Sequence, residues 1–296
     1  MKKLLVHQVI MISLFVIAAF MSSCNKDDNN NNNNGNKVDP GTIATSNLIA
    51  YFPFDAEPTA GSSVANSTSI TFARKVGNVT FVPGRRGNAY QGNSAESYLE
   101  YNVAPGSPFA TMQEFTIATW IKTPVTTTGA AKIFSLNGGD VFMGNLALIQ
   151  ESQAVGDSVD MKVYLYDSAS PDWKGQDIRM NKKEFTNDKW FHFAAVYRMS
   201  TSSLEFYANG KRVASQVKYA GPVPTTGSQP LLEGITLGSD MSKIYFGAWP
   251  QQIAGTPESW MTYFKGMIDE FRIYNKALSD QELSDLYNAE VSQITE

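Results

Sequence analysis

Cysteine and histidine are scarce in this sequence. Its 296 residues include one cysteine, Cys24, and two histidines, His7 and His192. A lone cysteine cannot form an intramolecular disulfide. His7 lies in an N-terminal segment that we expect to be cleaved off, and the remaining His192 cannot build a zinc site based on several histidines. His192 lies in the strand-like pattern KWFHFAAVY, where a structural role is expected, so histidine-dependent catalytic triads are excluded as well.

Basic tracts and phosphate-binding motifs are also missing. The chain has 24 Lys and Arg against 28 Asp and Glu, which gives a net charge of −4. Without a cluster of positive charge, nucleic acid is not expected as a partner. The chain has no P-loop, and the glycines of NGGDVFMGN, residues 137–145, lack the spacing and the following helix of a dinucleotide-binding fingerprint.

The N-terminus has the pattern of a lipoprotein signal peptide, residues 1–23. Two lysines precede the apolar run VIMISLFVIAAFM, which is too short to span a membrane as a helix. The run ends in MSSC, with small residues directly before Cys24, although Met21 stands where leucine is more common in such cleavage sites. We therefore predict that Cys24 becomes the lipidated N-terminus, and cleavage would change the net charge from −4 to −6 because two lysines are lost.

A polar stretch follows the cysteine. Residues 24–46 contain NKDDNNNNNNGNK and very few apolar side chains, so they cannot offset the entropy lost on ordering. We predict a disordered Asn-rich tether. Its KDD resembles the acidic export signal of surface lipoproteins in some Gram-negative bacteria, which predicts a lipid-anchored protein of the outer membrane that faces the cell exterior.

Residues 47–296 have the composition of one globular domain, and their patterns predict β-strands. In FTIATWIK, Phe115 and Ile117 alternate with Thr116, Ala118 and Trp120, as in a half-buried strand. In SLEFYANGKRV, Asn209 and Gly210 supply a two-residue hairpin turn. Many such segments with turn signals between them predict an all-β sandwich or barrel.

One helix is predicted, near the C-terminus. Ser279 is placed to cap it, Glu282 can return a hydrogen bond to the cap, and Leu278 can pack on Leu283. Leu283 and Leu286 belong to its apolar stripe. We expect this helix to close an end or edge of the sandwich.

Seven segments in order resemble a known family. They are LIAYFPFD, VTFVPGRRGNAYQGNSAESYLEY, EFTIATWIK, DKWFHFAAVYR, SLEFYANGKRV, ITLGS and FKGMIDEFRIYNKALSDQEL. Together they resemble a laminin G-like domain of the concanavalin A-like lectin/glucanase superfamily in its bacterial form, from about Leu48 to Tyr287. The resemblance implies a two-sheet antiparallel jelly roll with one short C-terminal helix, and a carbohydrate- or protein-binding role.

The superfamily also contains glycosidases, so catalysis has to be considered. The glucanase members use an E-x-D-x-x-E strand to hold two carboxylates at the spacing that retaining enzymes need. No glutamate in this chain is followed two positions later by an aspartate. A pair assembled from different strands stays open, but a non-enzyme is the favoured interpretation.

Two adjacent acids in KGMIDEFRIY raise the question of a metal. Strict alternation would place Asp269 with Phe271 and Ile273, and would place Glu270 with Arg272 on the opposite face, where the two can pair. Relatives carry a structural calcium ion at a rim of the sandwich, which the resemblance would assign to Asp269 and Asp55, with Asn66 as a neutral third ligand. The second acid that relatives carry after Asp55 is absent here, because the chain reads AGSSVANS.

Ligand-binding aromatics are expected on loops. Sugars are recognised by rings that stack on the apolar face of the pyranose. Five loop aromatics are candidates, although each could instead anchor its own loop: Trp173, Tyr219, Trp249, Trp260 and Tyr263. Trp120 and Trp190 lie in strand patterns and are assigned to the core.

These observations lead to one main hypothesis and two alternatives. The main hypothesis is a non-catalytic lipoprotein that captures a polysaccharide or a glycoprotein glycan at the cell surface. The first alternative is a protein-binding adhesin or assembly subunit with outer-membrane protein partners, and the second is a divergent glycoside hydrolase. In each case the membrane is contacted only through the N-terminal lipid, and one structural calcium ion is the only cofactor considered.

Overall fold

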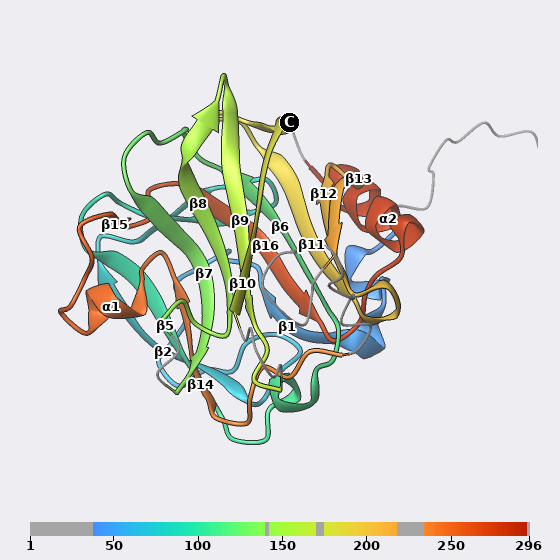
Figure 1. Cartoon of the computed structure of the whole chain (residues 1–296), viewed down its shortest axis with the longest axis horizontal. Helices are drawn as coiled ribbons and strands as arrows, with labels where there is room; N and C mark the ends of the chain where they lie inside the picture. Colours follow the sequence, from blue (N-terminus) through green and yellow to red (C-terminus); the bar gives the residue numbers. More distant parts are fainter. Residues whose placement is uncertain (1–37, 140–141, 170–174, 218–233, 295–296) are drawn as a thin grey trace, which may run out of the picture. The chain divides into compact units, whose positions relative to one another are not determined.

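A computed structural model describes residues 38–139, 142–169, 175–217 and 234–294. These residues form two antiparallel sheets that face each other, as the sequence predicted (Figure 1). Within the described part of the chain, no helix has the length and apolarity needed to cross a membrane.

Sheet A has the strand order β13-β12-β11-β6-β16-β4-β3, and β1 pairs with β16 beside this path. Its strands, in chain order, are β1 (Leu48–Phe52), β3 (Thr80–Pro83), β4 (Asn88–Gln91), β6 (Phe115–Lys122), β11 (Phe191–Arg198), β12 (Ser203–Ala208), β13 (Lys211–Val217) and β16 (Met267–Tyr274).

Sheet B has the strand order β10-β9-β8-β7-β14-β5-β2, and β15 pairs with β7 in parallel. Its strands, in chain order, are β2 (Ile70–Gly77), β5 (Ser97–Val103), β7 (Ala130–Gly138), β8 (Leu146–Val155), β9 (Ser158–Tyr166), β10 (Gly175–Thr186), β14 (Met241–Phe246) and β15 (Met261–Thr262).

The core lies between the sheets and is rich in aromatic rings. Phe52 is edge-on to Tyr101 and Phe246 at centroid distances of 5.0 Å each, and Phe134 and Phe271 also pack on Phe246. Such tilted aromatic pairs add to the stabilisation from burial alone. The alternation read from FTIATWIK is confirmed, because Phe115 and Ile117 are in this core while Ala118 packs on the opposite face of sheet A.

The predicted hairpin and helix are both present. Asn209 and Gly210 join β12 to β13 with φ values of 50° and 74°. Helix α2 (Asp280–Val291) is capped by Ser279, whose side chain accepts a hydrogen bond from Glu282 N while the Glu282 side chain bonds back to the cap.

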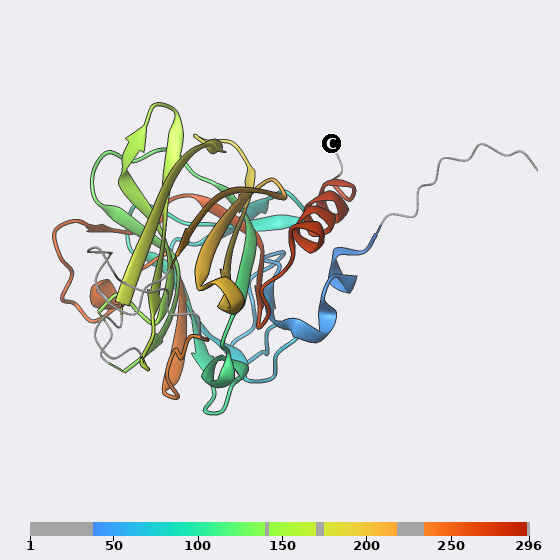
Figure 2. The ribbon, with the colours of Figure 1, turned by 45° about the vertical axis from the view of Figure 1, so that its right-hand side comes forward.

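The position of α2 differs from the prediction. Leu283 and Leu286 pack with Ala118, Ala194 and Val196 on the outer face of sheet A, so the helix covers a face and not an end or edge. Figure 2 shows α2 beside the N-terminal segment, and contacts join α2 to η1 (Pro40–Thr42). The other short turns are η2 (Thr45–Asn47), η3 (Pro108–Thr111), η4 (Met199–Thr201) and α1 (Pro250–Ile253).

The ordered N-terminal segment corrects the predicted domain boundary. Residues 38–46 were assigned to the tether, but they include η1 and lead into η2, and Ile43 and Ala44 pack against the apolar cluster under α2. Gln293 Nε2 also donates to Val38 O. The domain therefore begins before Asn47, because these few apolar side chains find a partner surface that is visible only in the fold. The remaining tether residues and Cys24 lie outside the described residues.

Candidate binding sites

The two acids of β16 do not follow strict alternation. The pairing of β16 with β6 shifts register between Asp269 and Arg272, and Glu270 has a left-handed φ of 54°. This is a β-bulge, in which an extra residue reverses the side-chain alternation beyond it. Ile268 and Phe271 consequently both face the core. The expectation that Asp269 and Glu270 lie on opposite faces was wrong, because both acids reach the same residue, Arg86.

Asp269 fastens the turn between β3 and β4. Its Oδ2 accepts hydrogen bonds from the backbone N–H groups of Arg85 at 2.7 Å and Arg86 at 2.9 Å. The residue is fully buried, and Oδ1 has no hydrogen-bond partner among the described residues. Burial raises the pKa of Asp269 to about 8, an effect that the two backbone hydrogen bonds only partly oppose. Asp269 is thus largely protonated at neutral pH unless a cation replaces the proton.

The predicted metal ligands come together only in part. Asp55 reaches the same turn as Asp269, where its Oδ1 accepts a hydrogen bond of 3.1 Å from Asn88 N, and a Cβ on Gly87 would lie 1.9 Å from that oxygen. The unpartnered Oδ1 of Asp269 and the exposed Asp55 suit a cation. Asn66 is exposed on another turn with φ 62°, and no hydrogen bond within the described ranges joins it to either acid. The described residues contain no group of three His, Cys, Asp or Glu placed to hold a metal.

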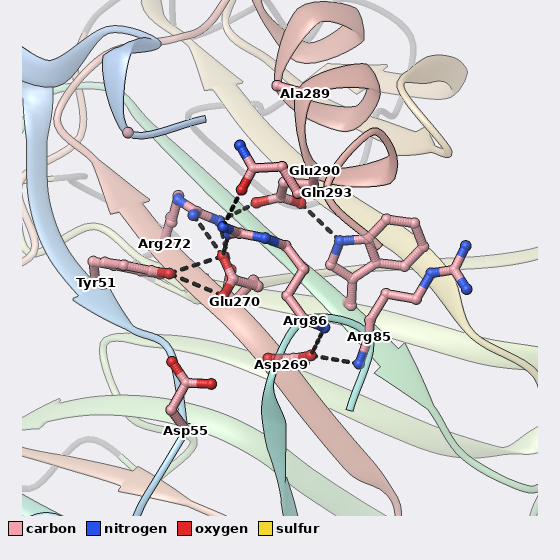
Figure 3. Close-up of polar contacts among 12 residues, drawn as sticks. Tyr51, Asp55, Arg85, Arg86, Asp269, Glu270, Arg272, Ala289, Glu290 and Gln293 are labelled. Atoms are coloured by element: carbon pink, nitrogen blue, oxygen red, sulfur yellow. Dashed lines mark hydrogen bonds and ion pairs between the residues drawn. The ribbon is translucent and has the colours of Figure 1, made fainter. Parts of the chain in front are cut away.

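Glu270 belongs to a buried network of charges below α2 (Figure 3). Arg272 Nη2 donates to Glu270 Oε2 at 2.6 Å, which confirms the predicted pair, and Arg272 Nη1 also pairs with Glu290 of α2. Arg86 pairs with Glu270 from the other side, and Tyr51 Oη donates to the same carboxylate at 2.8 and 2.9 Å. Two guanidinium groups therefore balance two carboxylates, which is how buried charge is tolerated.

His192 lies beside this network. Its side chain is 1% exposed, its Nε2 is 3.6 Å from Glu290 Oε2, and neither ring nitrogen has a hydrogen bond within the described ranges. Burial, together with the positive charge of Arg272, lowers the pKa of His192 to about 3. A neutral imidazole sealed between Trp120 and Tyr287 fits the structural role predicted for it.

Trp249 is buried over the outer face of sheet B. Its Nε1 donates to Ala130 O at 2.9 Å, and Lys132 Nζ lies 4.2 Å from the centroid of the ring. The residue is 0% exposed, so it anchors its loop, which is the alternative considered for it, and stacking on a sugar would require this loop to move. Trp260 packs edge-on against it at 5.0 Å and is 39% exposed.

Tyr263 lines a small hollow, the Tyr263 hollow, of about 210 Å³. The other residues that line it are Ser94, Thr126, Thr128, Ala131, Gln150, Thr262 and Lys265. The last two predicted ligand-binding residues, Trp173 and Tyr219, lie outside the described residues.

A larger hollow, the Asp240 hollow, was not predicted. It measures about 500 Å³ and is lined by Phe142, Tyr164, Tyr166, Ser168 and Asp240 around the glycine turn 138–139. Two features of the sequence could have indicated this hollow, namely tyrosines at the alternate positions 164 and 166 and the glycines before Asp240. They were not combined because the segments that form the hollow are far apart in the sequence. β7 runs from the Tyr263 hollow to the Asp240 hollow, so its nine residues place them roughly 25 Å apart.

Charged side chains also occupy the outer face of sheet B. Glu151 of β8 lies directly opposite Asp160 of β9, so the fold does bring together two carboxylates from different strands. Each is held by a cation, because Lys162 pairs with Glu151 and Arg179 Nε donates to Asp160 Oδ2 at 2.5 Å. Asp160 is only 1% exposed. A glycosidase needs a proton-donating acid that reaches the substrate, and this buried, paired carboxylate does not provide one.

Comparisons with known proteins agree with this architecture. A family model described as the concanavalin A-like lectin/glucanases superfamily matches residues 93–284. No curated protein sequence matches the chain.

Similar solved structures are binding domains of botulinum neurotoxins. The binding domain of botulinum neurotoxin DC in complex with rat synaptotagmin II has a TM-score of 0.55 and 16% identity, covering 84% of this chain and 52% of that one. The same domain in complex with SialylT has a TM-score of 0.54 and 16% identity, with coverages of 82% and 52%. A structure of botulinum neurotoxin type C, whose cell entry is described as dependent upon interaction with two ganglioside molecules, has a TM-score of 0.54 and 13% identity, with coverages of 84% and 53%. This chain thus spans about half the length of these structures, and the likeness concerns the fold.

Proposed function

The chain belongs to the concanavalin A-like lectin/glucanase superfamily, and we propose that it is a non-catalytic module that binds carbohydrate at a cell surface. The observation that carries this proposal is the Asp240 hollow, where three aromatic side chains surround a carboxylate. Aromatic rings that stack on a pyranose, combined with a few polar groups for its hydroxyls, are the usual composition of a sugar site.

The paired acids of sheet B support binding over catalysis. Glu151 and Asp160 are the described carboxylates that directly face each other on the outer side of this sheet, and each has a cationic partner. A divergent glycoside hydrolase would need one of these carboxyl groups free to protonate a leaving group. We therefore rank hydrolysis below binding.

The comparisons support a binding role in this fold without defining the ligand. One neurotoxin binding domain is described in complex with a protein, rat synaptotagmin II, and the cell entry of neurotoxin type C is described as dependent upon two ganglioside molecules. For this chain we propose a polysaccharide or a glycoprotein glycan as the ligand. Lipidation at Cys24 would hold the domain at the outer membrane, facing the exterior, through the tether.

A protein-binding adhesin or assembly subunit is the second candidate. Phe142 and Trp260 are large apolar side chains with exposed fractions of 47% and 39%. Apolar rings on a surface can also dock an outer-membrane protein partner.

A structural calcium ion at the rim is part of the proposal. Asp269 and Asp55 would hold it, and it would replace the proton that burial otherwise places on Asp269. Asn66 does not join these two acids in the structure, so further oxygens would have to come from backbone carbonyls and water, because calcium takes six to eight ligands.

A glycan array on residues 25–296, which lack the predicted signal peptide and lipid, tests the proposed function. We expect binding to at least one class of polysaccharide and no release of reducing ends during prolonged incubation. A chain that binds no glycan but captures one specific outer-membrane protein would support the adhesin. Reducing ends released by the wild type and not by Glu151→Gln would support the hydrolase.

A further inference from the structure

We infer that the Asp240 hollow selects sugar units without negative charge, and that it takes a neutral or amino sugar whose hydroxyl or protonated amine donates to Asp240. The inference rests on the proposed glycan-binding function and specifies its site and ligand class.

The first component is an aromatic wall on one strand. Tyr164 and Tyr166 are alternate residues of β9 and point to the outer face of sheet B, since the intervening Leu165 belongs to the core. Their strand partner β10 begins at Gly175, opposite Tyr166. A Cβ on Gly175 would lie 2.0 Å from the Tyr164 hydroxyl, so this glycine makes room for the ring to lie across the neighbouring strand. Both rings are half-buried and line the hollow.

The second component is a carboxylate, Asp240, without a partner in the described part of the chain. Asp240 is exposed, and among the described residues no hydrogen bond or ion pair engages its side chain. A Cβ on Gly139 would lie 2.7 Å from Asp240 Oδ2, and one on Gly238 would lie 3.1 Å from Oδ1. The glycines therefore leave space for the carboxylate inside the hollow, where it can accept two hydrogen bonds from a ligand.

The third component is a fixed floor. Asn145 is buried and joins the two sides of the hollow, because its Oδ1 accepts from Gly138 N at 2.8 Å and its Nδ2 donates to Leu237 O at 2.6 Å. Ser168 Oγ donates to Thr236 O at 2.8 Å. These polar groups position the backbone, so less ordering is needed when a ligand binds.

The charge of the hollow sets the ligand class. The ten lining residues that the structure describes include one aspartate and no lysine, arginine or histidine. The nearest cation of β9 on the same face is Lys162, and it is paired with Glu151 and Asp177. Among the described residues, the lining therefore offers no cation to compensate a sialic acid or uronic acid carboxylate beside Asp240, which favours rejection of such a ligand. By contrast, the Tyr263 hollow contains Lys265.

The test uses residues 25–296 and a panel of neutral oligosaccharides, glucosamine oligomers, and sialylated and uronate oligosaccharides, with affinities from calorimetry. We expect neutral or glucosamine ligands to bind at least about tenfold more tightly than the acidic ones. Tyr166→Ala should weaken binding about tenfold through loss of stacking. Asp240→Asn should also weaken the binding of neutral and amino sugars about tenfold. It should reduce the difference in affinity between these ligands and the acidic ones, because the substitution removes the charge and keeps a hydrogen-bond acceptor.

Asp188→Asn is the matched control for Asp240→Asn, since it removes one exposed carboxylate from a turn outside both hollows and should leave these affinities unchanged. Glycan binding that survives Tyr166→Ala and Asp240→Asn, or that is tightest for sialylated or uronate ligands, would overturn the inference and leave the proposed function intact. Failure of every panel member to bind would count against both. Circular dichroism and urea midpoints verify that each variant is folded.

Discussion

Trp120 Nε1 donates a hydrogen bond of 2.7 Å to Glu290 Oε2. Trp120 comes from the centre of sheet A and Glu290 from the last turn of α2, so this bond joins the C-terminal helix to the sandwich. Glu290 is 0% exposed and also pairs with Arg272. The helix is therefore held by a buried charge as well as by its apolar stripe.

Removal of this charge should destabilise the domain. Glu290→Ala leaves Arg272 with one carboxylate partner fewer and Trp120 without an acceptor, so we expect a loss of about 3–5 kcal/mol in the free energy of unfolding. Urea denaturation measures it. Asn288→Ala, at an exposed position of the same helix, is the control and should change stability by less than about 0.5 kcal/mol. Equal effects of the two changes would contradict the role assigned to Glu290.

His192 should make stability depend on pH. The pKa of His192 in the folded state, about 3, lies below the ordinary value of 6.5. The contribution of the neutral His192 to the free energy of unfolding is therefore complete above pH 6.5 and is lost as the pH falls toward 3. One proton accounts for at most about 1.4 kcal/mol per pH unit, or about 2 kcal/mol between pH 6.5 and 5.

The measurement compares wild type with His192→Gln at each pH. Burial raises the pKa of Glu290 to about 7, which works in the opposite direction because a raised carboxyl pKa favours the folded state at low pH. This opposing contribution is present in both chains and largely cancels in the difference. A difference that does not change with pH would show that His192 is not buried in its neutral form.

Calcium should stabilise the domain through the rim acids. For chelator-treated protein at pH 7, we expect calcium at about 100 times its Kd to raise the melting temperature by about 5 °C or more. Asp269→Asn and Asp55→Asn should each remove the shift, and Asn66→Ala tests whether that residue is a ligand. No shift and no binding heat in millimolar calcium would refute the site.

The two tryptophans of the 249–260 loop should differ in their effects. Trp249→Ala removes a ring that is 0% exposed and should cost about 3–5 kcal/mol in the free energy of unfolding. Trp260→Ala should cost clearly less, about 1 kcal/mol, because 39% of the residue is already in solvent. Urea midpoints compare them. A tolerated Trp249→Ala would show that this loop is not anchored as described.

Cys24 should determine where the protein is found. In a Gram-negative host, wild type is expected in the outer-membrane fraction and accessible to protease added to intact cells, and mass spectrometry should find acyl groups on the N-terminal peptide. Cys24→Ala should abolish this modification. A protease-resistant wild type would place the domain on the periplasmic side, and an unmodified N-terminus would refute lipidation.

Several features of the fold could be read from the sequence because they depend on neighbouring residues. Alternation in FTIATWIK, the Asn209–Gly210 turn and the Ser279–Glu282 cap are local patterns with a direct physical cause, and the structure has all three. The order of the family segments predicted the two-sheet architecture. The Glu270–Arg272 pair was also predicted correctly, although the path of the strand around it was not.

The sites depended on contacts between distant segments. The bulge at Asp269 and Glu270 arises where β16 meets β6, and the turn at Arg85 and Arg86 supplies the N–H groups that hold Asp269. The alternation of residues in the sequence cannot reveal this bulge, because one extra residue changes the face that every later side chain of the strand occupies.

The sequence by itself determined the strand pattern, the capped helix and the family. Only the tertiary structure decided that Trp249 would be buried, since the ring is covered by packing on Ala130 and Lys132. Only the tertiary structure also brought Gly139, Tyr166 and Asp240 around one hollow. Burial and cavity shape are properties of segments that meet in space, whereas periodicity and capping act within a few residues of the chain.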